Sequence, residues 1–292
     1  MTRLRLAVDS ATALLAQAGI DSARWDAEEL AAHLAGTERG RLAVIDPPGD
    51  EFFSRYHAAV TARSRRVPLQ HLTGAVSFGP VRLTLGPGVF IPRPETEAML
   101  EWAAAQWLPA QPVIVDLCTG CGALAIALAR RWPDARVLGI DDCPSALDYA
   151  RRNAAATTVE LLQADVTDAG LLAELDGRAD LVVANPPYIP DGALLEPEVA
   201  QHDPHHALFA GPDGMAVIAA VVRLAGRWLR PGGMLAVEHD DITSPHTVQL
   251  ITQTALFDEI TGRVDLAGRP RFVTARRRDE PCPAPVTSSV KP

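Results

Sequence analysis

Cysteine is scarce in this chain. The 292 residues include four cysteines, Cys118, Cys121, Cys143 and Cys282, which are too few for a disulfide scaffold in a protein of this length. Cys118 and Cys121 form a CxxC pair, a spacing found in redox motifs and in half of a zinc site. No second CxxC and no nearby histidine pair completes a zinc site. We therefore interpret both cysteines as small residues in a turn.

The chain also lacks a long apolar run and a surplus of positive charge. No apolar stretch reaches the roughly 18 residues of a membrane-spanning helix, and the N-terminus resembles an amphipathic helix rather than a secretion signal. We therefore expect a cytoplasmic protein with no membrane partner. The formal net charge is −9, whereas proteins that wrap nucleic acid are usually basic. We expect no direct nucleic-acid substrate, and a basic protein partner stays open.

Hydrophobic residues are plentiful, at 48% of the chain, and their spacing divides it into parts. Residues 1–73 show helical spacing in three segments, which end near Gly19, Gly36 and Arg66, and they predict a small helical domain. Residues 74–94 alternate apolar and polar residues between glycines and prolines, which predicts a β-hairpin connector. The tail at 279–292 is rich in Pro, Ser and Thr, and we expect it to be disordered.

Residues 95–278 alternate short apolar strands with helices, and this pattern predicts an α/β domain with a mostly parallel sheet covered on both faces. Parallel sheets bind ligands at the carboxyl ends of their strands. The expected strands are 112–117, 135–141, 159–165, 179–185 and 232–239, with a closing antiparallel pair at 259–266 and 271–277. The expected helices are 122–132, 144–155, 215–229 and 247–255.

The first polar signal at a strand end is a glycine-containing turn, which comprises Asp116, Leu117, Cys118, Thr119, Gly120, Cys121 and Gly122. Gly120 and Gly122 allow a ligand to approach the backbone closely and permit positive φ. The Asp116 carboxylate can hold a cationic amino group. Many strand–helix turns contain two glycines, so this signal is weak by itself.

Acidic residues end the next two expected strands. Asp141 follows the glycine turn by about twenty residues, where a carboxylate can accept hydrogen bonds from ribose hydroxyls. Asp165 ends the third strand and can lie near an adenine. Strand ends favour polar residues in any case, so the order of the acids is more informative than each one alone. The turn lacks the GxGxxG spacing of dinucleotide sites because position 118 is Cys.

The sequence Asn185-Pro186-Pro187-Tyr188 ends the fourth strand. Two prolines lack N–H donors and fix φ, so the Asn185 side chain and the Pro186 carbonyl can both aim acceptors at a planar NH₂ group, which has two N–H donors. Tyr188 can pack flat against that group. Such a clamp suits methylation of an amide nitrogen, whose lone pair is delocalised, because positioning and electrostatics then supply much of the rate. We expect no metal, and we interpret the histidines at 202–206 as an ordinary loop.

The glycine turn followed by the acid on the second strand resembles class I methyltransferases. Nearly the whole chain resembles the release factor glutamine methyltransferases, the PrmC/HemK family. NPPY alone is shared with adenine-N6 DNA methyltransferases, but the helical front domain and IPRPETE separate the two. The segments that carry the resemblance are VPLQHLTG (67–74), VFIPRPETE (89–97), NPPYIP (185–190), PEVAQHDPHHALFAGPDGM (197–215) and DLAGRPR (265–271).

The resemblance implies a Rossmann-like, mostly parallel seven-stranded sheet. It also implies transfer of methyl from S-adenosylmethionine to the glutamine amide in the GGQ loop of class I peptide chain release factors. Arg93 and Glu95 would help to order the cleft and bind substrate. The clamp residues Asn185, Pro186, Pro187 and Tyr188 would grip the glutamine and serve catalysis. The cofactor would contact Asp116, Cys118, Thr119, Gly120, Cys121, Gly122, Asp141, Asp165, Val166 and Asn185.

Four positions depart from the family pattern. Cys118 stands where the family usually has Gly, Cys121 where it has Ser or Thr, Val166 where it often has an aromatic residue, and Asp240 where it commonly has Gly. The first three touch the expected cofactor site, and none removes the clamp. Two alternatives therefore stay open: an adenine-N6 nucleic-acid methyltransferase and a non-catalytic cofactor-binding homologue.

Overall fold

The computed structural model describes residues 2–279. The tail that we expect to be disordered, residues 279–292, lies outside the described residues except for Asp279. The chain forms two compact units. The first comprises Met1–Val76, Thr84–Ile91 and Leu195–Asp203, and the second comprises Ser77–Leu83, Pro92–Leu194 and Pro204–Pro292.

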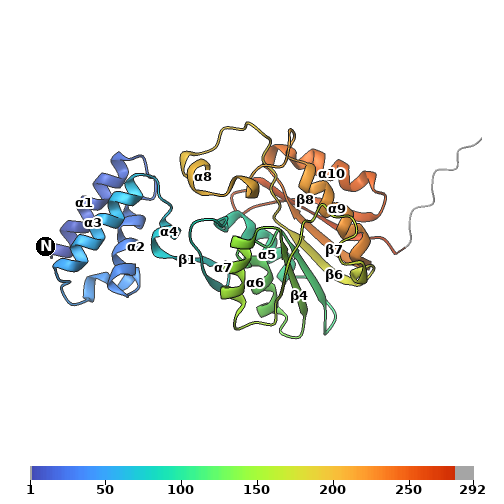
Figure 1. The fold of residues 1–292 in the computed structure, drawn as a ribbon, viewed down its shortest axis with the longest axis horizontal. Helices are drawn as coiled ribbons and strands as arrows, with labels where there is room; N and C mark the ends of the chain where they lie inside the picture. Colours follow the sequence, from blue (N-terminus) through green and yellow to red (C-terminus); the bar gives the residue numbers. More distant parts are fainter. Residues whose placement is uncertain (1, 280–292) are drawn as a thin grey trace, which may run out of the picture. The chain divides into compact units, whose positions relative to one another are not determined.

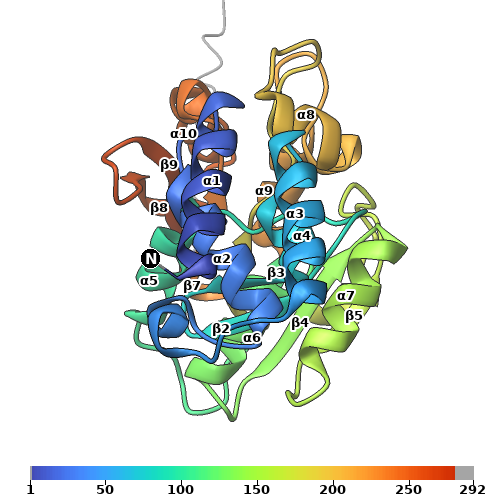
Figure 2. The ribbon, with the colours of Figure 1, turned by 90° about the vertical axis from the view of Figure 1, so that its left-hand side faces the viewer.

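The first unit is a helical bundle, as the apolar spacing predicted. Thr2 caps the first helix by accepting a hydrogen bond from the Arg5 backbone N–H, and Gly36 ends the second in the left-handed conformation that glycine favours. The first three α-helices pack together around a core that includes Leu15, Leu30 and Tyr56 (Figures 1 and 2). The elements are α1 (Arg3–Gln17), α2 (Ala23–Ala35), η1 (Arg39–Val44), α3 (Asp50–Ser64), α4 (Leu69–Thr73) and α8 (Pro197–His202).

An ion cluster lies inside this unit. Arg63 of α3 donates from Nε to Asp26 of α2 at 2.6 Å and from Nη1 to Glu198 of α8 at 2.7 Å. Arg63 and Asp26 are both buried. The sequence analysis predicted no helix at α8, because six residues are too few to show a helical repeat. Glu198 joins this short helix, which follows the clamp in the chain, to the core of the bundle.

The predicted hairpin is present as β1 (Ala75–Phe78) and β2 (Val81–Thr84), a two-stranded sheet. Its turn includes Gly79 at φ +48°. A Cβ atom at Gly79 would lie 2.7 Å from Leu100 Cδ2, so a larger residue in the turn would require the Leu100 side chain to shift.

The second unit contains the predicted seven-stranded sheet, in the order β5-β4-β3-β6-β7-β9-β8. β3 to β7 pair in parallel, and β9 is antiparallel to both β7 and β8. The helices α5, α6 and α7 cover one face, and α9 and α10 cover the other (Figure 1). The strands are β3 (Val113–Leu117), β4 (Arg136–Asp141), β5 (Glu160–Gln163), β6 (Ala179–Ala184), β7 (Leu229–Glu238), β8 (Phe257–Val264) and β9 (Pro270–Arg277).

The helices of this unit agree with the predicted ones to within a few residues at each end. Two elements before β3, the 3₁₀ turn η2 and α5, were not predicted, because three and eight residues show too little of a helical repeat. The helices and 3₁₀ turns are η2 (Pro94–Thr96), α5 (Glu97–Ala104), α6 (Ala123–Arg131), α7 (Pro144–Ala154), η3 (Ala173–Leu175), η4 (His205–Ala207), α9 (Ala216–Trp228), η5 (Asp241–Thr243) and α10 (Ser244–Gln253).

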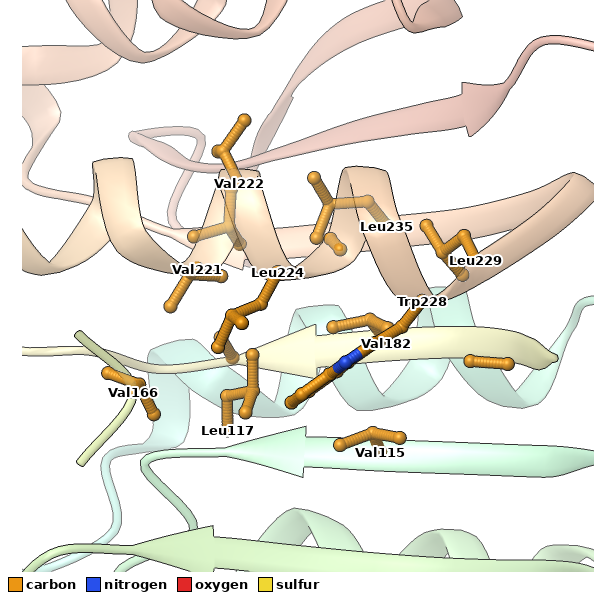
Figure 3. Packing of buried hydrophobic residues seen from close by; sticks show 14 of the residues in the cluster. Val115, Leu117, Val166, Val182, Val221, Val222, Leu224, Trp228, Leu229 and Leu235 are labelled. Carbon is orange, nitrogen blue, oxygen red and sulfur yellow. The ribbon is translucent and has the colours of Figure 1, made fainter. Parts of the chain in front are cut away.

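Alternate residues along the strands build the core beneath α9. Val115, Leu117 and Val182 face this helix and pack with the fully buried Trp228 (Figure 3). Successive residues of a strand point to opposite faces, so Asp116 lies on the other face, toward α6. The chain reverses its direction of strand addition between β3 and β6, which creates the switch point at which such sheets bind ligands.

No helix within the described residues is long and apolar enough to cross a membrane.

We predict that Arg63→Ala destabilises the helical unit by about 3–5 kcal/mol, because it leaves Asp26 buried without its cation. Arg3 pairs with Asp50 where both side chains are exposed, so Arg3→Ala should cost less than about 1 kcal/mol. Urea unfolding together with hydrogen exchange in α2 and α3 measures both effects. Equal losses in the two variants would contradict the assignment.

Candidate active site

The switch point brings the predicted cofactor turn and the predicted clamp together. Leu117 of β3 pairs in register with Ala184 of β6. The residues that follow, Cys118 and Asn185, therefore leave the sheet side by side. β4 is the other neighbour of β3 and ends at Asp141, so three polar strand ends lie along one edge of the sheet.

Asp116 is a buried carboxyl group in the cofactor turn. Its Oδ2 accepts hydrogen bonds from Thr119 Oγ1 at 2.5 Å and from the Ala125 backbone N–H at 3.0 Å. Its Oδ1 is buried without a hydrogen-bond partner in the described residues. Burial raises the pKa of Asp116 to about 7, although both hydrogen bonds oppose the shift. A buried acceptor with no donor fits a ligand that brings a cationic amino group.

The turn itself is held in left-handed backbone conformations. The φ angles are +58° at Cys118, +57° at Gly120 and +88° at Gly122. A Cβ atom at Gly120 would meet nothing within 4 Å, so there is open space beside the backbone for a ligand. Cys118 adopts a conformation that costs a non-glycine residue about 1–3 kcal/mol. The departure from the family at position 118 therefore strains the turn.

Asp141 fastens this turn to the end of β4. Its Oδ2 accepts from the Gly120 backbone N–H at 2.8 Å, and its Oδ1 accepts from the Cys143 N–H at 3.0 Å. Burial raises the pKa of Asp141, and these two hydrogen bonds oppose the rise. Asp141 thus shapes the turn, and its contact with a ribose stays a prediction.

The other predicted cofactor residues lie beyond the short strand β5. Asp165 is exposed and accepts a hydrogen bond from the Thr167 N–H, which is the main reason that its pKa is lowered. Val166 is buried in the core cluster beneath α9 (Figure 3). Its contact with an adenine stays a prediction.

The surroundings of the two thiols in the turn favour their neutral, protonated form. Cys118 and Cys121 are free, and burial raises the pKa of both, that of Cys121 to about 12. Neutral thiols are poor metal ligands and poor nucleophiles. Within residues 2–279 no group of three or more His, Cys, Asp or Glu side chains is arranged to hold a metal ion.

The clamp is tied to a buried carboxyl group. Asn185 Nδ2 donates to Thr96 Oγ1 at 3.1 Å, and Thr96 Oγ1 donates to Glu238 Oε2 at 2.7 Å. The Tyr188 hydroxyl donates to Glu238 Oε1 at 3.1 Å. Both the first and the last residue of the clamp therefore depend on Glu238, at the end of β7.

Glu238 has 1% of its surface exposed. Burial raises its pKa to about 7, while Thr96, Tyr188 and the positive charge of Arg271 oppose the rise and Glu95 adds to it. Burial and Glu238 also raise the pKa of Tyr188, so the phenol stays protonated and acts as a donor.

The segment after the clamp is braced by a second stretch of chain. Ile189 pairs in parallel with Phe209, and His205 stacks on the Phe209 ring with the two centroids 4.3 Å apart. A Cβ atom at Gly214 would lie 2.2 Å from the Tyr188 carbonyl oxygen. Among the histidines at 202–206, His205 therefore packs on the stretch of chain that pairs with Ile189, the residue directly after the clamp.

Three residues of this site were not predicted, namely Thr96, Glu238 and Gly214. Each stands in a segment that the sequence analysis quoted without assigning the residue a role. The predicted residues Arg93 and Glu95 flank Thr96, and the Arg93 carbonyl accepts from the Thr96 N–H. In the sequence, the signal for Glu238 is an acidic residue at the end of an apolar strand.

Comparison with known proteins agrees with this architecture. The model of the PrmC N-terminal domain matches residues 7–74, and that of the methyltransferase small domain matches residues 94–202. A release factor glutamine methyltransferase from Mycobacterium tuberculosis is 70% identical over 278 residues, which cover 94% of this chain and 91% of the relative.

A 4-amino-L-phenylalanine/4-methylamino-L-phenylalanine methyltransferase from Streptomyces pristinaespiralis is 43% identical, covering 89% of this chain and 88% of the relative. The solved structure of a T. thermophilus 16S rRNA methyltransferase in complex with AdoMet and guanosine is similar in fold. Its TM-score is 0.50 at 23% identity, and the match covers 70% of this chain and 50% of that one.

The sheet order and the matched methyltransferase domain place the chain among the class I methyltransferases, whose methyl donor is S-adenosylmethionine. The chain belongs to the family of release factor glutamine methyltransferases. The predicted family, fold and cofactor are thereby confirmed.

We predict that S-adenosylmethionine binds more tightly as the pH rises through about 7, with release of a proton, because a bound cation favours ionised Asp116. Calorimetry in buffers of different ionisation heat measures the proton. Asp116→Asn should weaken binding about 10–100-fold, the value of a hydrogen bond to a charged group, and should abolish the release.

The same substitution should stabilise the ligand-free protein at pH 8. The pKa of Asp116 is raised on folding, so its contribution to stability is present below the ordinary pKa and is lost as the pH rises to about 7. Equal stability of Asp116→Asn and the parent at pH 8, together with unchanged proton release, would contradict this account.

Gly214→Ala should lower the rate of methyl transfer at least about tenfold, because the added methyl pushes Tyr188 out of place. Gly211→Ala is the matched control. Gly211 also has positive φ, but a Cβ atom there would meet nothing closer than 3.7 Å. The measurement is the steady-state rate of methyl transfer in both variants. Equal losses of rate would show that backbone strain alone is responsible.

Proposed function

We propose that this chain methylates the side-chain amide nitrogen, N5, of the glutamine in the GGQ motif of class I peptide chain release factors. Family membership and 70% identity to a release factor glutamine methyltransferase support the proposal. The observation that carries it is the fixed orientation of Asn185 beside the cofactor turn. In this proposal a planar amide NH₂ donates to two acceptors, Asn185 Oδ1 and the Pro186 carbonyl.

The residues of the turn suit the cofactor. The unpartnered Asp116 Oδ1 would face its amino group, the open space at Gly120 would admit it against the backbone, and Asp141 would reach its ribose. S-adenosylmethionine supplies a methyl group that its sulfonium makes electrophilic. We assign to the same site the predicted residues Cys118, Thr119, Cys121, Gly122, Asp165 and Val166.

The clamp residues act on the substrate amide. Asn185 and Pro186 accept its two N–H bonds, which holds the nitrogen in line with the methyl group and draws electron density onto it. Pro187 fixes the backbone and Tyr188 packs against the amide plane. The nitrogen sheds its extra proton after transfer, so no base is needed beforehand. Arg93 and Glu95 order the loop that presents Thr96.

The finer assignments follow from this reaction. The substrate is a whole protein, the release factor, rather than a nucleic acid, which agrees with the net charge of −9. We assign recognition of the release factor to the helical domain at residues 1–73, connected by 74–94 to a catalytic domain at 95–278. The location is the cytoplasm, where translation terminates.

A second candidate is methylation of a free aromatic amine, because a relative at 43% identity is named for 4-amino-L-phenylalanine. An arylamine and the exocyclic amine of adenine also offer two N–H donors to the clamp. Identity to the release factor enzymes is higher, and this favours glutamine.

The test is transfer of tritiated methyl from the cofactor to intact release factor, to the same factor with its GGQ glutamine replaced by alanine, to adenine-containing DNA, and to 4-amino-L-phenylalanine. We expect label only in the intact factor. Label in the alanine-substituted factor, in DNA or in the amino acid would contradict the proposal.

Asn185→Ala should reduce transfer about 100- to 1000-fold, the usual cost of removing one donor or acceptor that acts on the transition state. Binding of S-adenosylmethionine, followed by calorimetry, should change less than about threefold, since that energy difference is under 1 kcal/mol. Retained transfer would rule out the role of Asn185. Loss of cofactor binding would show instead that Asn185 mainly holds the cofactor, the other role that the family resemblance implies for it.

A further inference from the structure

The orientation of the Asn185 amide is set by a chain of two hydrogen bonds that ends on Glu238. The Thr96 hydroxyl has one proton, and that proton is donated to Glu238 Oε2 at 2.7 Å. The Thr96 oxygen therefore meets Asn185 as an acceptor, so the NH₂ end of the amide must face it. The observed bond from Asn185 Nδ2 to Thr96 Oγ1 agrees with this requirement.

The opposite amide atom is the one that a substrate N–H needs. With Nδ2 on Thr96, Asn185 Oδ1 is turned away from Thr96 and keeps its lone pairs. If the Thr96 proton instead pointed at Asn185, the amide would flip by 180° and present NH₂ to the substrate NH₂. Two donors would then face each other, and the clamp would repel the group that it is built to hold.

The ionised form of Glu238 maintains this order because a carboxylate only accepts hydrogen bonds. Its other oxygen accepts from Tyr188, so both oxygens receive a donor from the clamp side. The groups that face Glu238 are Thr96 and Glu95 of the η2 segment, Tyr188 after β6 and Arg271 of β9. Arg271 is the cation among them and favours the ionised form.

We propose that Glu238 is a positioning residue for methyl transfer, whose carboxylate acts through the Thr96 hydroxyl to hold Asn185 with its oxygen toward the substrate amide. The inference rests on the proposed function. It assigns a role to Thr96 and Glu238, which act through Asn185, and it explains why the IPRPETE segment lies beside NPPY.

A protonated Glu238 can donate to Thr96 and release the Thr96 proton toward Asn185. Transfer at saturating cofactor and release factor should therefore fall as the pH drops below about 7, where burial has raised the pKa of Glu238. Saturating cofactor separates this effect from that of Asp116, which acts on cofactor binding.

The experiment compares kcat from pH 6 to pH 8.5 in four variants. Thr96→Val keeps the shape but removes the hydroxyl, and it should lower kcat at pH 8 about 10–100-fold, because a misplacement of about 1 Å can cost about 100-fold, with cofactor affinity unchanged. Thr96→Ser restores the hydroxyl and should keep kcat within about threefold of the parent. Thr247→Val is the control, because Thr247 is also buried and its hydroxyl donates to the Thr243 carbonyl, four residues earlier in the chain and away from Glu238.

Glu238→Gln tests the carboxylate itself. A carboxamide has one oxygen and one NH₂, so it cannot accept from Thr96 and Tyr188 at once through two oxygens. We expect a lower kcat that does not change between pH 6 and pH 8. In the parent and in Thr96→Ser, kcat should fall as the pH drops below about 7, and we call this fall the acid limb.

The inference is overturned if Thr96→Val matches Thr96→Ser, or if Glu238→Gln keeps the acid limb of the parent. If Thr96→Val does not fold, the comparison of Glu238→Gln with the parent decides alone. A parent enzyme that does not methylate the release factor at all would reject the proposed function instead, so the two failures are distinguishable.

Discussion

The burial of one carboxylate, that of Glu238, is the constraint on which the clamp depends. An ionised group out of water is costly unless it is hydrogen-bonded, and this one receives the hydroxyls of Thr96 and Tyr188. Satisfying the carboxylate fixes both hydroxyls, and fixing Thr96 fixes the amide of Asn185. The orientations of Thr96 and of two clamp side chains, Asn185 and Tyr188, thus follow from the need to satisfy a single buried carboxylate.

The sheet determines where this clamp operates. The register of Leu117 with Ala184 places the proposed cofactor turn and the proposed clamp at adjacent strand ends. Both sides of the site contain an acid, Asp116 or Glu238, whose pKa burial raises to about 7. Such groups lower the stability of the ligand-free fold above that pH, which is the usual relation between an active site and its scaffold.

The sequence predicted the fold well because its signals are local. Apolar runs of strand length, helical spacing and glycine turns can all be recognised within about ten residues. The NPPY motif likewise indicates a site for a planar NH₂ group, although it does not separate glutamine from adenine. Short elements without a full repeat, such as α8, gave no signal. The connection between Thr96 and Glu238 could not be predicted, because 142 positions separate them and only the folded chain brings η2 to the end of β7. Asp141 was predicted as a ligand for ribose, and its hydrogen bonds to the turn likewise depend on the folded backbone.

The most direct measurement is a high-resolution structure of the enzyme with S-adenosylhomocysteine and a glutamine-containing loop peptide, with hydrogen positions resolved by neutron diffraction. The account predicts Asn185 Nδ2 on the Thr96 oxygen, the Thr96 proton on Glu238, and Asn185 Oδ1 together with the Pro186 carbonyl accepting the two glutamine N–H bonds. A Thr96 proton directed at Asn185, or a glutamine amide held elsewhere, would contradict it.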